Sequence, residues 1–115
     1  MGGRDKGLVP YQGRPLAAWA LDRLVAQTAT QFAIANRNQP DYASLLQQAH
    51  ATITPGVPAV LPDAPDLPLA SGPLAGIVTA LRHTTTLWLM VTPCDTPHLP
   101  SDLVARLLDE AERCG

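Results

Sequence analysis

Apolar side chains recur at helical spacing in four segments of the chain. In the first of them, Leu16, Trp19, Ala20 and Leu24 fall on one face, as expected of a helix that packs on a core. The same spacing predicts helices over residues 15–27, 41–51, 73–82 and 101–115. We therefore expect four amphipathic helices.

The ends of these helices carry residues that suit the positions. Pro15 and Pro73 fit a first helical turn, where the missing N–H is not needed. Asp41 and Ser101 have side-chain oxygens that can accept a hydrogen bond from a free backbone N–H at a helix start. We expect these two residues to be caps.

Three short apolar runs lie between the helices and predict strands. They are Gln31–Asn36, Val57–Leu61 and Leu87–Val91. Pro58 lacks an N–H, so it places the second strand at a sheet edge. The third run has no polar alternation, which is typical of a strand covered on both faces.

Helices and strands alternate in this order, which predicts an α/β fold with a parallel sheet. Ligands of such sheets bind beyond the carboxyl ends of the strands. Asn36, Asp63 and Asp95 follow the three predicted strands, so we expect a binding site at the edge where they meet.

Composition narrows the class of protein. The 115 residues fit one domain, and the net charge of −2, without a cluster of Lys and Arg, argues against a nucleic-acid partner. No apolar run approaches the roughly 20 residues of a membrane span. We therefore expect no membrane partner. Cys94 and Cys114 belong to no metal-binding spacing, so we expect a reduced, cytoplasmic protein.

Three segments carry candidate chemistry. Gly2 and Gly3 would let the backbone approach a phosphate, which Lys6 could reach with its charge, although a frayed tail would look the same. Asp95 could hold a divalent ion, or it could cap a turn. The segment 72–76 could meet an anion or a base with free N–H groups, or it could be a tight helix entry.

Taken together, these motifs resemble the molybdenum cofactor guanylyltransferase family, MobA. The resemblance covers almost the whole chain and rests on segments 1–8 (MGGRDKGL), 13–16 (GRPL), 35–37 (ANR), Asp63, 72–76 (GPLAG) and 93–97 (PCDTP). It implies transfer of GMP from GTP to the molybdopterin cofactor with release of pyrophosphate. It also implies Mg2+ and a three-layer, mostly parallel sheet of the Rossmann-like nucleotidyltransferase type.

The resemblance assigns roles by position. Lys6 resembles the lysine that binds the triphosphate, and Asp95 resembles the carboxylate that holds magnesium. Asn36 is expected at the nucleotide site, and either Asp63 or Asp66 is its acidic residue. The loop with Gly72, Pro73 and Leu74 resembles the one that lies against guanine.

The resemblance also implies segments that these 115 residues do not contain. A strand and a Leu-Ala-Gly-Gly loop are expected ahead of Met1, and a further half-domain after Gly115. We therefore expect residues 1–115 to be a partial GTP-binding domain whose unpaired strand edges cause weak stability or self-association. The alternatives are a transferase that uses CTP or a sugar phosphate, and a module that binds a nucleotide or a partner without catalysis.

Overall fold

A computed structural model describes residues 5–66 and 73–114 of the chain. Its α-helices are α1 (Leu16–Gln27), α2 (Gln39–Gln48), α3 (Pro73–His83) and α4 (Leu103–Cys114), and a short 3-10 helix, η1, spans Lys6–Leu8. Its strands are β1 (Pro10–Tyr11), β2 (Arg14–Pro15), β3 (Ala33–Ile34) and β4 (Val60–Leu61). The α/β class expected from the sequence is confirmed.

The strands form two small sheets. β1 and β2 make an antiparallel hairpin, whose turn holds Gln12 and Gly13 at positive φ. β3 and β4 pair in parallel, with Ala33 opposite Val60 and Ile34 opposite Leu61. The parallel sheet in the described residues therefore has two strands, β3 and β4, and each is shorter than the run that predicted it.

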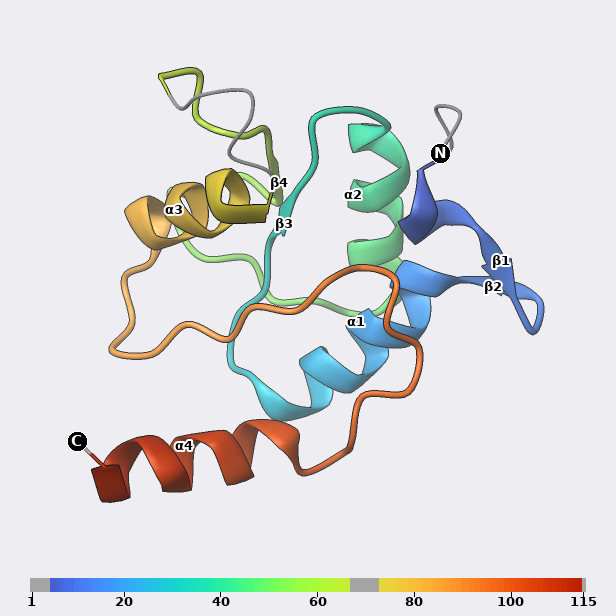
Figure 1. Ribbon diagram of the computed structural model, residues 1–115. Coiled ribbons are helices and arrows are strands. Elements are labelled where there is room, and N and C mark those ends of the chain that lie inside the picture. The colour runs from blue at the N-terminus through green and yellow to red at the C-terminus, as the bar shows by residue number, and fades with distance from the viewer. Residues whose placement is uncertain (1–4, 67–72, 115) are drawn as a thin grey trace.

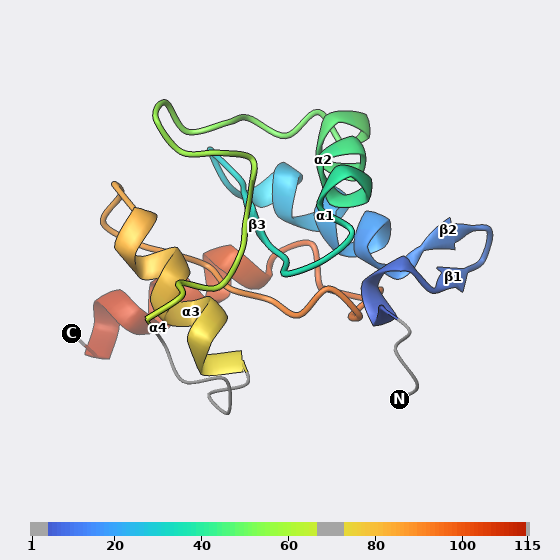
Figure 2. The same ribbon diagram turned by 90° about the horizontal axis from the view of Figure 1, so that it is seen from above.

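Helices cover both sides of the parallel pair. β3 lies between α3 on one side and α1 with α2 on the other in the two views of Figures 1 and 2. The core consists of small and medium-sized side chains, including Ala17, Ala18, Leu45 and Leu46. Leu8 of η1 and Ala35, which follows β3, both pack against this core, so the two segments lie close together.

The helix predictions are confirmed, with shifted ends. α2 begins two residues before Asp41, because Pro40 suits a first helical turn. Asn38, which precedes the helix, has a left-handed backbone conformation. Asp41 is thus an acidic residue of the first turn and not the cap. The last helix begins at Leu103, two residues after Ser101.

The predicted strand at Leu87–Val91 is wrong. These residues form no strand, and the trace between α3 and α4 runs past β3 as an irregular segment (Figure 1). Leu87 is 90% exposed and Trp88 52% exposed. A strand needs a hydrogen-bonded neighbour, and within residues 5–66 and 73–114 no strand pairs with this segment.

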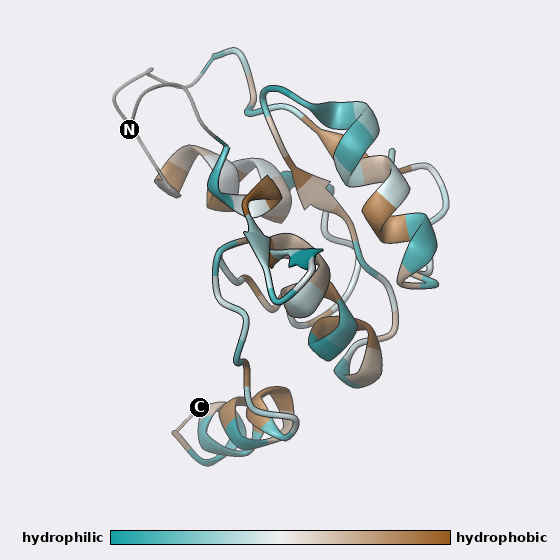
Figure 3. Ribbon diagram, turned by 90° about the vertical axis from the view of Figure 1, so that its right-hand side faces the viewer, coloured by the Kyte–Doolittle hydropathy of each residue, from teal (hydrophilic) through white to brown (hydrophobic). Residues whose placement is uncertain are grey.

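The last helix is amphipathic but has no buried residue. Figure 3 shows the helix that ends at the C-terminus standing apart, with apolar and polar faces. Leu107 is 49% exposed. A hydrogen bond near the start of the helix joins it to α1: Val104 N donates to Gln27 Oε1 over 2.8 Å. None of the helices in the described part is long and apolar enough to cross a membrane.

Candidate functional site

A cleft of about 550 Å³ lies where η1, the end of β3 and the segment before α4 meet. These three segments supply most of its wall, and Tyr42 of α2 completes it. The lining residues are Asp5, Lys6, Gly7, Ile34, Ala35, Asn36, Arg37, Tyr42, Cys94 and Asp95. The cleft thus contains two cations and two carboxylates.

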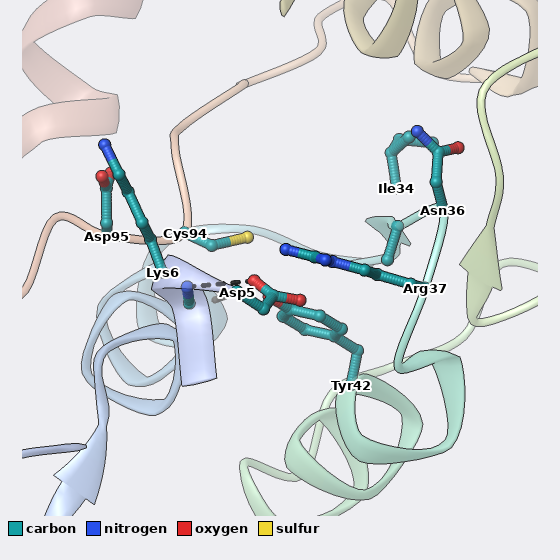
Figure 4. Close-up of a pocket in the computed structure, with 10 residues that line it drawn as sticks. Asp5, Lys6, Ile34, Asn36, Arg37, Tyr42, Cys94 and Asp95 are labelled. Atoms are coloured by element: carbon teal, nitrogen blue, oxygen red, sulfur yellow. Dashed lines mark hydrogen bonds between the residues drawn. The ribbon is translucent and has the colours of Figure 1, made fainter. Parts of the chain in front are cut away.

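Lys6 and Asp95 lie on the same side of this cleft, opposite Asn36 (Figure 4). Both side chains are exposed, and the two charged ends form no ion pair within 4 Å among the described residues. The fold therefore brings together two residues that the sequence analysis singled out separately, and leaves both open to a ligand.

Asn36 and Asp63 are held together by two hydrogen bonds. Asn36 Nδ2 donates to Asp63 Oδ2 over 2.9 Å, and the Asp63 backbone N–H donates to Asn36 Oδ1 over 2.8 Å. This contact follows from the parallel pairing of β3 and β4, whose carboxyl ends lie side by side. Asn36 lines the cleft, whereas Asp63 does not.

Asp66, the competitor of Asp63, lies in a different contact. Its two carboxylate oxygens accept hydrogen bonds from Arg82 over 2.8 and 3.0 Å, and this arginine holds the pKa of Asp66 below its usual value. Of these two aspartates, Asp63 is hydrogen-bonded to a cleft residue, Asn36, whereas Asp66 forms an exposed ion pair with Arg82 of α3.

The loop expected against a nucleobase is described only in part. Gly72 lies outside the described residues, whereas Pro73 and Leu74 begin α3, with Leu74 64% exposed. One turn further along α3, Gly76 lies close to β3 and to Asp63: a Cβ there would be 3.7 Å from Ile34 Cγ2 and 3.6 Å from Asp63 Oδ1. The start of α3 is thus near the Asn36–Asp63 pair and outside the cleft wall.

Asp5 and Tyr42 form a contact that the sequence analysis did not predict. The Tyr42 hydroxyl donates to Asp5 Oδ1 over 2.6 Å, and Tyr42 is 4% exposed. Burial, together with the carboxylate, raises the pKa of Tyr42 far above its ordinary value. Burial by itself would raise the pKa of Asp5. Hydrogen bonds from Tyr42, Asn38 and Gly7 outweigh the effect of burial, so the pKa of Asp5 lies below its ordinary value.

This contact holds η1, which carries Lys6. Asp5 caps η1 by accepting from Gly7 N over 3.2 Å. A Cβ on Gly7 would lie inside the contact distance of Tyr42 Oη and 3.0 Å from Cys94 Cβ, so only glycine fits between them. Tyr42 is the fourth residue of α2, and nothing in the sequence showed that its hydroxyl reaches Asp5.

The cleft suits a magnesium ion that arrives with a phosphate ligand. The described residues contain no group of three or more His, Cys, Asp or Glu side chains that would hold a metal by themselves. Mg2+ commonly uses one or two carboxylates, with waters and substrate phosphates completing its shell, and the exposed Asp95 can supply one. Burial, with the charges of Asp5 and Asp95, raises the pKa of the Cys94 thiol, which favours its neutral form.

Known proteins resemble the chain over its full length. The model of the MobA-like NTP transferase domain matches residues 1–115. A molybdenum cofactor guanylyltransferase of Cupriavidus metallidurans is 44% identical over 97% of this chain and 49% of its own length. The enzyme of the same name from Methylibium petroleiphilum is 46% identical over 97% of this chain and 49% of its own length. The one from Acidovorax ebreus is 45% identical over 100% of this chain and 48% of its own length. The chain spans about half the length of these curated relatives.

Proposed function

Because the chain belongs to the family of MobA-like NTP transferase domains, we propose that it is the GTP-binding part of a molybdenum cofactor guanylyltransferase. Such an enzyme transfers GMP from GTP to the molybdopterin cofactor and releases pyrophosphate. The family match confirms the resemblance carried by the Lys6 and Asp95 segments. A three-layer fold with a mostly parallel sheet belongs to the same proposal, and the parallel pairing of β3 with β4 supports it.

The observation that carries the proposal is the position of Lys6 and Asp95 on one side of one cleft. A lysine ammonium neutralises phosphate oxygens as a point charge, and a nearby carboxylate can hold the cation that accompanies a triphosphate. Neither group is consumed by an ion pair in the described part of the chain. This arrangement is suited to a metal-bound polyphosphate.

Magnesium, when bound at Asp95, would supply charge neutralisation at the triphosphate. The residues of the chain supply positioning. Lys6 binds and orients the phosphates, and the hydrogen-bonded Asn36–Asp63 pair offers an amide and a carboxylate to the nucleotide. Gly72, Pro73 and Leu74 are proposed to lie against the guanine.

The experiment uses the longest open reading frame that contains these residues. The purified protein is incubated with GTP, Mg2+ and molybdopterin, and pyrophosphate release is measured. Asp95→Asn is expected to lower the rate by at least about 100-fold, since it removes the metal-binding charge. Lys6→Ala is expected mainly to raise the KM for GTP. Asp41→Asn, an exposed change in α2, is the control.

The same assay separates the alternatives. Competition between GTP and CTP identifies the nucleotide that is used. Nucleotide binding without pyrophosphate release would favour the non-catalytic module, and full activity of Asp95→Asn would remove Asp95 from the mechanism.

A further inference from the structure

Arg37 is a cation in the cleft to which the sequence analysis gave no role. It follows β3 directly after Asn36, lines the cleft and is exposed. Figure 4 shows its side chain pointing into the cleft, toward the side on which Lys6 and Cys94 lie. The guanidinium therefore faces the space that a ligand of Lys6 would occupy.

The carboxylate whose charge acts on Arg37 is engaged elsewhere. Asp5 accepts hydrogen bonds from Tyr42 Oη over 2.6 Å, Gly7 N over 3.2 Å and Asn38 Nδ2 over 3.3 Å. The positive charge of Arg37 contributes to lowering the pKa of Asp5, but the two side chains form no ion pair within 4 Å. Among the described residues, the Asp5 carboxylate is thus hydrogen-bonded to Tyr42, Gly7 and Asn38 and not to Arg37.

Three other arginines of the described chain, Arg14, Arg82 and Arg113, pair with carboxylates. Arg14 pairs with Asp22 at 2.8 Å, and Arg82 pairs with Asp66 at the same distance. Arg23 and Arg106 form no ion pair within 4 Å among the described residues, but neither of them lines the cleft. Arg37 forms no ion pair or side-chain hydrogen bond with residues 5–66 or 73–114, although it lies in a cleft with two aspartates. A guanidinium that lines a cleft without such a partner is suited to bidentate binding of an anion that enters the cleft.

We propose that Arg37 is a second phosphate-binding residue of the cleft and contacts a phosphate group of the nucleoside triphosphate from the wall opposite Lys6. The inference rests on the proposed function, because that function supplies the triphosphate. It adds a planar, bidentate donor to the point charge of Lys6. The Asp5–Tyr42 contact supports this proposal, because the Asp5 carboxylate is hydrogen-bonded to Tyr42 and forms no ion pair with Arg37.

The test measures binding to the full-length protein by calorimetry at fixed ionic strength. The probes are GTP, guanosine and inorganic tripolyphosphate. Arg37→Gln is expected to weaken GTP and tripolyphosphate about 10- to 100-fold, as expected for a lost hydrogen bond to a charged group, and to leave guanosine unchanged. Arg37→Lys keeps the charge but loses the fork, so it is expected to lie between Arg37→Gln and the parent.

Arg23→Gln is the matched control, because Arg23 is also an exposed arginine but lies on α1 outside the cleft. It is expected to bind all three probes like the parent. Thermal unfolding of each variant checks that the fold is retained. If Arg37→Gln binds GTP and tripolyphosphate within about twofold of Arg23→Gln, the inference is overturned while the proposed function stands.

Two further outcomes separate the inference from the proposed function. Binding of tripolyphosphate that depends on Arg37, without any pyrophosphate release from GTP, supports the inference and contradicts the transferase. Failure of the parent protein to bind any of the phosphate probes overturns both.

Discussion

At the scale of single residues, the candidate site depends on the contact between Asp5 and Tyr42. It joins the start of the chain to α2 through a hydrogen bond of 2.6 Å, and it is buried on the tyrosine side. Hydrogen bonds to a charged group are stronger than neutral ones. Lys6 is the next residue along the chain, so this contact sets where its backbone lies.

Tyr42→Phe removes this hydrogen bond and keeps the ring. The free energy of unfolding is expected to fall by about 1–3 kcal/mol near neutral pH. The pKa of Asp5 is lowered in the fold, so its contribution is present above the ordinary value of 3.8 and is lost as pH falls below it. The difference between parent and variant is therefore expected to shrink in acid.

Urea unfolding near pH 7 and near pH 3 measures this difference. Tyr11→Phe is the control, since the Tyr11 hydroxyl forms exposed hydrogen bonds with His98 and Gln12 and none with a carboxylate of the described residues. An equal loss of stability for Tyr42→Phe at both pH values would show that the charge of Asp5 is not involved.

Gly7 is a second residue whose identity follows from close packing. Gly7→Ala is expected to lower the free energy of unfolding by about 1–3 kcal/mol, because the new methyl group would overlap Tyr42 and crowd Cys94. Gly76→Ala in α3 is the matched variant. Its methyl group would meet only ordinary contacts, and the helix favours alanine, so it is expected to be neutral or stabilising. Equal stabilities of the two variants in urea unfolding would contradict this packing argument.

At the scale of elements, the helices differ in what their apolar faces contact. α1 and α2 pack on each other, and Leu46 of α2 is 1% exposed. α4 has the same kind of amphipathic pattern, but it touches the rest near its start and buries no residue. An apolar stripe indicates a helix, and burial of that stripe also requires a partner surface.

Two leucine substitutions measure this difference between helices. Leu46→Ala is expected to lower the free energy of unfolding by about 2–5 kcal/mol, because it opens a cavity in the core. Leu107→Ala in α4 is expected to cost less than about 1 kcal/mol, since this side chain is 49% exposed. The comparison is made by urea unfolding of the 115-residue chain, and a comparable loss for both variants would mean that α4 is packed in solution.

At the scale of the whole molecule, the chain exposes more surface than a folded protein of its mass usually does. Its accessible surface is 7443 Å² for 12.2 kDa, against about 6,100 Å² expected from the scaling of monomeric proteins. The apolar segment Leu87–Val91 contributes to this excess, with Leu87 and Trp88 largely in solvent. Exposed apolar segments without strand partners favour association.

We therefore expect the 115-residue chain, prepared by itself, to self-associate. Sedimentation velocity is expected to show an average mass that rises with concentration, and Trp88→Lys to reduce this rise. Gln47→Lys is the control, because it adds the same charge at an exposed position of α2. A monomer at all concentrations, with a sharp unfolding transition that does not depend on concentration, would contradict the expectation.

The sequence by itself determined the α/β class, the four helices and the family. Helical spacing and helix-start residues are local signals, so the regions around 16–27 and 73–83 could be predicted closely. The motifs around Lys6 and Asp95 identified the family without any knowledge of their distance in space. The roles of these residues in binding and catalysis stay predictions.

The tertiary structure decided how long the strands are and which residues meet. The run at Leu87–Val91 has strand composition but no strand, because pairing depends on a neighbour that local pattern does not supply. Three features join residues that are far apart in the chain. They are the contact of Asp5 with Tyr42, the pairing of Asn36 with Asp63, and the position of Arg37 in the cleft. Such contacts arise only when packing of α1, α2 and β3 brings those segments together, so residue spacing alone could not reveal them.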